Sequence, residues 1–160
     1  MSAQSKIIPC LWFNFNAEEA VHHYTSIFRR SRILDVSHYG NAMPQFKGRV
    51  LTILFELEGQ RFQALNGGPQ YRFTEAISLS VDCADQAEVD ELWARLSEGG
   101  TEGQCAWLKD KFGVSWQIVP RALVTMLTDP DADKAARVMQ AMMNMRKIDI
   151  ARLQQAYNKQ

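Results

Sequence analysis

Apolar and polar positions along the first half of the chain follow the period of a strand, then that of a helix, then that of strands again. Four stretches have the aliphatic and aromatic content of strands, and they cover residues 7–15, 33–39, 49–57 and 61–65. Between the first two, Ala20, Tyr24, Ile27 and Phe28 recur at helical spacing and fall on one face. This half is therefore predicted to form a βαβββ module.

The same order starts again after Asn66-Gly-Gly-Pro69, the strongest break in regular structure in the sequence. The second set of strand-like stretches covers residues 76–81, 104–108 and 114–119, with a short strand expected near Thr101. The helical stretch in this half carries an apolar face and ends at Gly99-Gly100. A second βαβββ module is therefore predicted, and it repeats the pattern and length of the first rather than its sequence.

Both predicted helices begin with the signature of a capping box. Asn16 is followed three residues later by Glu19, and Asp85 is followed three residues later by Glu88. A side-chain oxygen at the first position can accept a hydrogen bond from the backbone at the second. We therefore expect both helices to be capped by their own sequence.

The region after residue 120 has a different pattern, in which helical spacing dominates. Asp129-Pro-Asp131 predicts a helix start with proline at the first helical position. One helix is expected over 132–145, and residues 148–157 are expected to form another helix or its continuation. The segment is rich in methionine, and packing against the sheet or a second subunit is preferred over an adaptable binding surface. The predicted organisation is one domain, with a first module at 7–66, a linker at 67–75, a second module at 76–120 and a helical tail at 121–160.

Composition narrows the classes of partner and compartment. Among 160 residues, 18 basic and 18 acidic side chains give a net charge of zero, which argues against nucleic acid or an anionic membrane as a partner. The stretch at 7–15 is too short for a signal peptide or a membrane span. Cys10, Cys83 and Cys105 are odd in number and lack metal-site spacing, so reduced thiols in a cytoplasmic protein are expected.

Four segments carry a resemblance to a known family. They are Leu11-Trp-Phe-Asn14 leading into Asn16-Ala-Glu-Glu-Ala20, Leu65-Asn-Gly-Gly-Pro69, Ser78-Leu-Ser-Val-Asp82 and Lys109-Asp-Lys-Phe-Gly-Val-Ser-Trp-Gln-Ile-Val-Pro120. Together with the doubled βαβββ order, they resemble the PhnB-like branch of the vicinal oxygen chelate superfamily, which includes glyoxalases and bleomycin-resistance proteins. Proteins of this branch often carry the label 3-demethylubiquinone-9 3-methyltransferase. The resemblance implies an α+β fold in which two tandem βαβββ modules form a curved mixed sheet around a cup, often within a homodimer, with C-terminal helices added here.

The resemblance also implies where a metal ion would be held in metal-dependent members. Those positions are occupied here by Pro9 and Ala76 in the first strands of the modules, by Gln117 in the last strand, and by Gln63 or a neighbour in the fourth strand. Proline and alanine have no ligating side-chain atom, and neutral glutamine replaces carboxylate poorly on a hard cation. We therefore expect neither the metal site nor another cofactor, which argues against the isomerase, dioxygenase and thiol-transferase activities of those members.

The candidate ligand-binding residues are aromatic, amide and thiol side chains on strands that would line the cup. They are Trp12, Gln63, Asn66, Cys105, Trp107, Trp116 and Gln117. The indoles could wall a pocket for a planar or apolar ligand that the amides orient, although core packing is the more common role of a tryptophan. Cys105 is expected on the strand face of Trp107, and no histidine accompanies it at the spacing of a nucleophile and its base, so packing is favoured.

The positions of histidine and glycine bear on two enzyme alternatives, a metalloenzyme and a methyltransferase. His22 and His23 point about 100° apart on a helix, so they cannot share a metal ion, and His38 stands alone in a strand. The first strand runs into its helix without the glycine-rich turn of common S-adenosylmethionine enzymes. The favoured function is therefore a small-molecule-binding homodimer, and the alternative is an enzyme, either a methyltransferase on a quinone-like aromatic or a divergent glyoxalase-type metalloenzyme.

Overall fold

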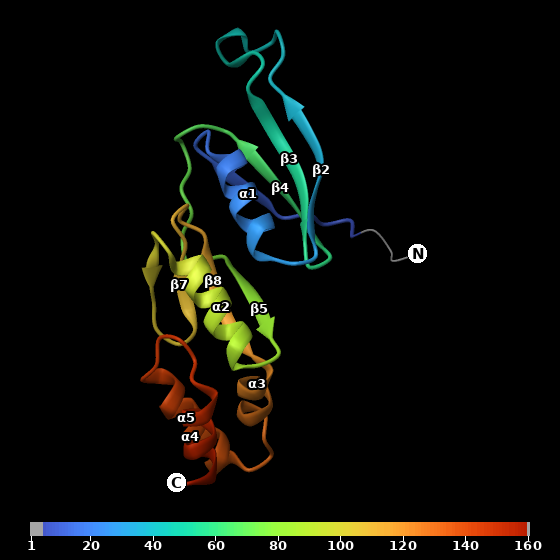
Figure 1. Cartoon of the computed structure of the whole chain (residues 1–160). Coiled ribbons are helices and arrows are strands. Elements are labelled where there is room, and N and C mark those ends of the chain that lie inside the picture. Colours follow the sequence, from blue (N-terminus) through green and yellow to red (C-terminus); the bar gives the residue numbers. More distant parts are fainter. Residues whose placement is uncertain (1–4, 160) are drawn as a thin grey trace. The chain divides into compact units, whose positions relative to one another are not determined.

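The structure is a computed structural model that describes residues 5–159 (Figure 1). Its helices and strands divide into two compact units, one up to Arg72 and one from Phe73 onward. The division falls inside the segment 67–75 that was predicted to be a linker. None of the helices within residues 5–159 is long and apolar enough to cross a membrane.

The first unit contains one four-stranded sheet with strand order β1-β4-β3-β2. Strand β1 pairs parallel with β4, and the other neighbours are antiparallel. Its elements are β1 (Cys10–Phe13), α1 (Ala17–Ile27), β2 (Ser31–His38), the short 3-10 helix η1 (Pro44–Phe46), β3 (Val50–Leu57) and β4 (Gln60–Asn66).

The second unit repeats this topology, with strand order β5-β8-β7-β6 and β5 parallel to β8. Its elements are β5 (Ser78–Cys83), α2 (Gln86–Ser97), β6 (Thr101–Glu102), β7 (Trp107–Lys109), β8 (Ser115–Pro120), α3 (Arg121–Leu127), α4 (Ala132–Met143) and α5 (Ile150–Asn158). The predicted α+β fold of two tandem βαβββ modules with mixed sheets and C-terminal helices is confirmed.

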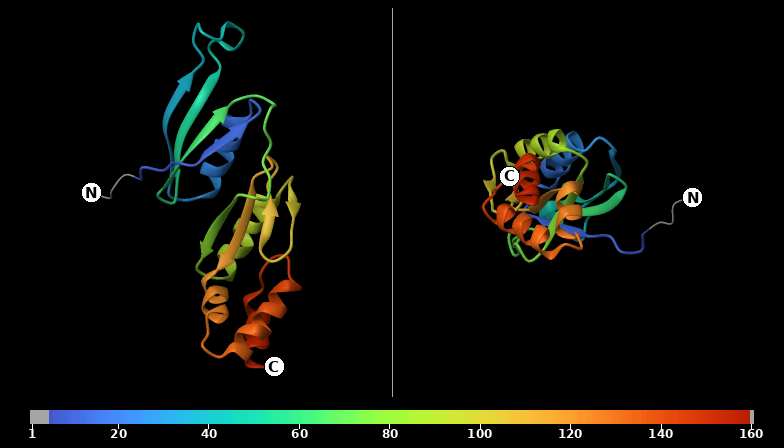
Figure 2. Two further views of the ribbon diagram at one scale, coloured as in Figure 1. Left: turned by 180° about the vertical axis from the view of Figure 1, so that it is seen from behind. Right: turned by 90° about the horizontal axis from the view of Figure 1, so that it is seen from below.

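Each helix within a module covers one face of its own sheet, as the view from behind makes visible (Figure 2, left). In the first unit the covered face includes Phe13, Phe55 and Ala64, which pack beneath the apolar side of α1 and are at most 2% exposed. Successive side chains of a strand point to opposite faces of the sheet. The residues between the buried ones therefore lie on the other side, which we call the open face of each unit.

Several local predictions differ from the structure. The strand expected from residue 104 begins only at Trp107, because Cys105 and Ala106 adopt positive φ angles of 56° and 74°. Helix α3 forms where the predicted tail had no separate helix. Pro130 precedes the helix cap instead of occupying the first turn, and Asp131 caps α4 by accepting hydrogen bonds from the backbone of Asp133 and Lys134.

The two helix caps have different origins. Asp85 Oδ1 accepts a 2.9 Å hydrogen bond from the Glu88 backbone, so the cap predicted at Asp85 is confirmed. The Glu88 side chain returns to the backbone of Ala84, one residue before the cap. The Asn16 side chain makes no capping hydrogen bond at α1. Asn66 Oδ1 accepts from the Ala17 backbone instead, so the cap predicted at Asn16 is supplied from strand β4. The Asn16 backbone, with φ of −122° and ψ of 23°, lacks the extended conformation that a capping residue usually adopts.

The tail helices build a second core against the end of the second sheet. Its buried members are Ala106, Leu123, Met126, Val138, Met145, Ile148 and Leu153. The Met-rich segment is split between roles, since Met145 is buried in this core whereas Met139 and Met143 are exposed.

Candidate functional site

On the open face of the first unit, a tryptophan and a glutamine lie on neighbouring strands. Trp12 is paired with Leu65 across the parallel β1–β4 contact, and Gln63 is paired with Cys10 on one side and Leu54 on the other. Directly paired residues point to the same face of a sheet. The half-buried Trp12 and Gln63 therefore share the open face, in adjacent rows.

The Trp12 ring is held in one position by the chain that follows β4. Its Nε1 donates a 2.8 Å hydrogen bond to the Gly68 carbonyl, and Tyr71 meets it edge to face with ring centroids 4.9 Å apart. A Cβ atom on Gly67 would lie only 2.3 Å from the ring. The indole orientation thus depends on a glycine at position 67, which allows the backbone to pass against the ring.

On the open face of the second unit, the same pair of residue types is in direct register. Trp107 lies opposite Gln117 in the β7–β8 pairing, and Ser80 flanks Gln117 on the other side. Gln117 Nε2 donates a 2.9 Å hydrogen bond to Ser78 Oγ, which fixes the amide while Trp107 stays half-buried. Lys109, next along β7 on this face, forms an ion pair with Glu75.

Two sequence candidates lie on the covered side instead. Asn66 is 2% exposed, and its amide nitrogen donates to Glu18 and to the Val50 carbonyl in addition to the cap at Ala17. Trp116 is also 2% exposed, and its Nε1 donates a 2.9 Å hydrogen bond to Asp110 Oδ2. Both residues hold the fold together where the structure places them.

Asp110 links the parts of the segment 109–120, one of the four that carry the family resemblance. Its Oδ1 accepts hydrogen bonds from the backbones of Phe112 and Val114, at 2.9 and 3.0 Å, while Oδ2 accepts from Trp116. A buried carboxylate is costly unless donors surround it, and this one closes the turn between β7 and β8 with three. The Asp-Lys-Phe-Gly turn and its Trp-Gln strand are therefore linked by one structural group.

The three thiols differ in environment, and none has the surroundings of an activated nucleophile. Burial, followed by nearby carboxylates, raises the pKa of Cys83 to about 12. Cys10 is open to solvent on one side, yet the atoms packed around it raise the pKa of its thiol as well. Cys105 lies in the left-handed turn before β7 rather than on the strand face predicted for it, because its backbone N–H donates to the Met145 carbonyl.

An aromatic cluster that the sequence did not predict surrounds the connection from β1 to α1. Phe15, with a positive φ of 59°, packs against Phe46 at a centroid distance of 4.9 Å, and the Arg49 guanidinium lies 4.1 Å above its ring. Tyr39 adjoins Phe46 and donates a hydrogen bond to the Asn66 carbonyl. The cluster fastens the β2–β3 hairpin to the end of β4.

The positions that would hold a metal ion do not supply a suitable set of donors. Pro9 and Ala76 are exposed residues before β1 and β5 and carry no ligating side-chain atom, and Gln63 and Gln117 are neutral amides. Within the part of the chain that the structure describes, no three His, Cys, Asp or Glu side chains gather as metal ligands would.

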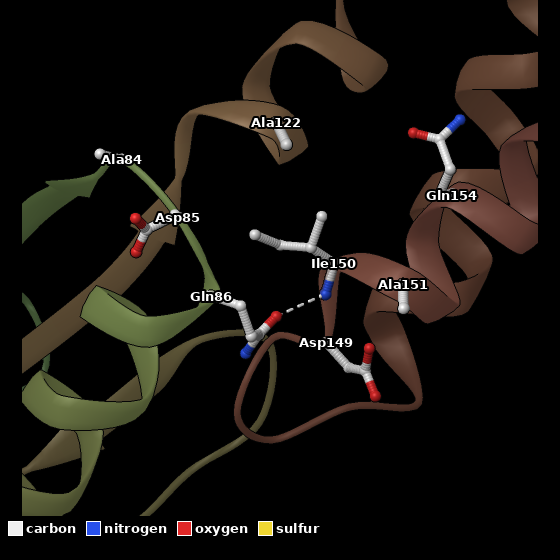
Figure 3. Close-up of a pocket in the computed structure, with 8 residues that line it drawn as sticks. All are labelled: Ala84, Asp85, Gln86, Ala122, Asp149, Ile150, Ala151 and Gln154. Atoms are coloured by element: carbon white, nitrogen blue, oxygen red, sulfur yellow. Dashed lines mark hydrogen bonds between the residues drawn. The ribbon is translucent and has the colours of Figure 1, made fainter.

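A hollow of about 590 Å³ lies in the second unit, between the starts of α2, α3 and α5 (Figure 3). Its walls are mostly apolar, with Ala84, Ala122 and Ile150 among them, and the capping residues Asp85 and Asp149 lie at its edge. None of the candidate residues from the sequence lines it. No sequence motif predicted this hollow, because its walls come from three separate segments of the chain.

Comparison with known proteins identifies the family. The family model named 3-demethylubiquinone-9 3-methyltransferase matches residues 5–119. A PhnB protein from Bacillus cereus is 34% identical, with a TM-score of 0.66 over 72% of this chain and 99% of that one. No curated protein matches the chain.

Two further solved structures share the fold at lower identity. A protein from Pseudomonas aeruginosa is 22% identical, with a TM-score of 0.61 over 73% of this chain and 98% of that one. A glyoxylase/bleomycin resistance protein/dioxygenase domain from Frankia is 16% identical, with a TM-score of 0.51 over 74% of this chain and 93% of that one. The family model and the PhnB protein together show that the chain belongs to the PhnB-like 3-demethylubiquinone-9 3-methyltransferase family.

Proposed function

We propose that the protein binds a small, planar and largely apolar molecule on the open faces of its sheets, without a metal ion. The observation that carries this proposal is the direct register of Trp107 with Gln117, together with the presence of Trp12 and Gln63 in adjacent rows of the open face of the first unit. In the second unit the pair offers a flat apolar ring beside an amide with both a donor and an acceptor, and the first unit carries the same two groups on its open face. That combination suits a ring that bears carbonyl or hydroxyl groups.

A quinone-like aromatic fits this chemistry. Stacking on an indole contributes about 0.5–1.5 kcal/mol beyond burial of area, and one amide hydrogen bond contributes a similar amount. The family name refers to a demethylated ubiquinone, which is a planar ring with carbonyl and hydroxyl oxygens. A ring of this kind therefore suits the indole and amide groups of the open faces.

The protein is further proposed to act as a homodimer in the cytoplasm. The support is a net charge of zero, which opposes self-association only weakly, and three free thiols, as expected in a reducing compartment. Organisation as one domain, with modules at 7–66 and 76–120, is part of the same proposal.

Isothermal titration calorimetry with a short-chain 3-demethylubiquinone tests the proposal. We expect saturable binding that weakens about tenfold in Trp107→Ala or Gln117→Ala, a loss of about 1.4 kcal/mol. Gln155→Ala, an exposed change on α5, is the matched control and should bind like the wild type. Absence of binding, or equal affinity in all variants, would contradict the proposal.

The two enzyme alternatives predict different binding by the same protein. A methyltransferase is the second candidate function, because the matching family carries that name. Stoichiometric binding of S-adenosylmethionine, with methyl transfer to the quinone, would establish it in place of simple binding. Metal retained through purification and lost in Gln117→Ala would instead favour a divergent metalloenzyme.

A further inference from the structure

The segment that leads into Trp107 has a conformation that its own residues disfavour. Cys105 and Ala106 both adopt left-handed backbone angles, with φ of 56° and 74°. Residues with a Cβ atom rarely adopt this region, and they remain there only when their surroundings hold them. What holds this turn therefore also determines how β7 begins.

The tail supplies that restraint through two backbone hydrogen bonds. Cys105 donates its N–H to the Met145 carbonyl at 2.8 Å, and Ala106 donates to the Arg146 carbonyl at 3.0 Å. Both acceptors lie in the connection between α4 and α5. The turn is thus fixed by chain about 40 residues further along the sequence.

Ala106 joins the tail to the sheet beside the proposed ligand-binding pair. Its side chain is 1% exposed within the tail core, and its carbonyl accepts a 2.9 Å hydrogen bond from the Ile118 backbone. Ile118 follows Gln117, and Ala106 precedes Trp107. A shift of the tail would therefore move both members of the pair.

The acceptor segment is itself anchored from another element. Gln86, at the start of α2, accepts a 2.8 Å hydrogen bond from the Ile150 backbone (Figure 3). It also donates one of 2.9 Å to the Ile148 carbonyl. Lys147 pairs with Asp90 of the same helix at 2.8 Å. The connection between α4 and α5 is thus held by α2, which gives the turn a firm support.

We propose that the C-terminal tail is the positioning element of the ligand-binding face in the second unit. Met145 and Arg146 hold Cys105 and Ala106 in the left-handed conformation, and this turn keeps Trp107 opposite Gln117. The ligand-related part of this inference rests on the proposed function, whereas the positioning of Trp107 does not. The family model ends at residue 119, so the tail residues that hold this turn lie outside the matched region, whereas the turn itself lies within it.

Fluorine NMR of protein labelled with 5-fluorotryptophan tests the positioning directly. The chain has four tryptophans, and single Trp→Phe variants assign their signals. Ile148→Ala opens a cavity in the tail core, and Val89→Ala opens a comparable one beneath α2; both residues are fully buried. We expect Ile148→Ala to shift or broaden the Trp107 signal and leave the Trp12 signal unchanged, while Val89→Ala leaves Trp107 as in the wild type.

Gln86→Ala is a second test, because it removes the hydrogen bonds that hold the α4–α5 connection without opening a core cavity. Exposed Gln140→Ala on α4 is its control. Gln86→Ala also decides the question if Ile148→Ala fails to fold. An unchanged Trp107 signal in Gln86→Ala, or equal changes in the variants and their controls, would overturn the inference.

Substitutions in the turn distinguish positioning from general destabilisation. Cys105→Gly suits a positive φ and should make the Trp107 signal less sensitive to Gln86→Ala, whereas β-branched Cys105→Val should increase that sensitivity. Equal sensitivity in both backgrounds would contradict the mechanism. Titration with the short-chain 3-demethylubiquinone should then show at least fivefold weaker binding to Gln86→Ala than to Gln140→Ala. If the wild type does not bind this quinone, the proposed function fails while the NMR result still judges the inference.

Discussion

Asn66 Oδ1 lies 3.0 Å from the backbone nitrogen of Ala17, so the last residue of β4 caps a helix that begins 49 residues earlier. The same side chain donates to Glu18 and to the Val50 carbonyl. One buried amide therefore joins β4, α1 and the start of β3. This relationship fixes the helix on the sheet and leaves the opposite face open.

Replacing Asn66 tests how much this joint contributes. Asn66→Ala leaves buried polar groups without their partner, so we expect a loss of about 2–3 kcal/mol in the free energy of unfolding. Asn16→Ala, at the position predicted from sequence to cap α1, should cost less than about 0.5 kcal/mol because its side chain makes no capping bond. Urea denaturation followed by circular dichroism measures both, and equal losses would show that the cap is misassigned.

The contact between Gly67 and Trp12 predicts a rescue. Gly67→Ala places a methyl group 2.3 Å from the indole and should cost about 1–3 kcal/mol of stability by overpacking. In a Trp12→Ala background the ring is gone, so the same substitution should cost much less. A double-mutant cycle by urea denaturation measures the coupling, and additive costs would refute the steric explanation.

Asp110 is predicted to stabilise the fold through the hydrogen bonds that both of its carboxylate oxygens accept. In Asp110→Asn the amide NH₂, a donor, must face another donor, either the Trp116 N–H or the two backbone N–H groups. We therefore expect a loss of about 1–3 kcal/mol in the free energy of unfolding. Exposed Lys111, its neighbour in the turn, is the control, and Lys111→Ala should change stability by less than about 0.5 kcal/mol. Thermal unfolding checks the pair; similar values would mean that the carboxylate is dispensable.

The raised pKa of Cys83 predicts both slow alkylation and a stability that depends on pH. With a folded pKa of about 12 against an ordinary value of 9.0, the thiol stays protonated in the native state at pH 8. Iodoacetamide should therefore label Cys10 well before Cys83, as peptide mass spectrometry can follow. The folded state binds this proton more tightly, so its stabilising contribution is full below pH 9 and declines as the pH rises toward 12. Cys83→Ala should flatten that decline, and early labelling of Cys83 in the native protein would contradict the assignment.

The order of strands and helices within the two βαβββ modules follows from the sequence alone, because strand and helix periods are local properties of neighbouring residues. The βαβββ repeat, the helix cap at Asp85 and the family blocks all lie within short segments. Trp116 and Gln117 were both candidate ligand-binding residues, although neighbouring residues of a strand point to opposite faces. The local pattern did not indicate which of those faces the helix covers.

Tertiary structure decided the features whose partners are distant in the chain. Asn66 took over the cap of α1 because burial at the end of β4 brings its amide to Ala17, a contact that no local pattern encodes. Cys105 and Ala106 left the predicted strand because two carbonyls of the tail accept their N–H groups, which offsets an unfavourable backbone conformation. The roles of the candidate tryptophans were also decided by tertiary packing. The helix on one side of each sheet buries Trp116 in the core, whereas Trp12 and Trp107 lie on the open faces.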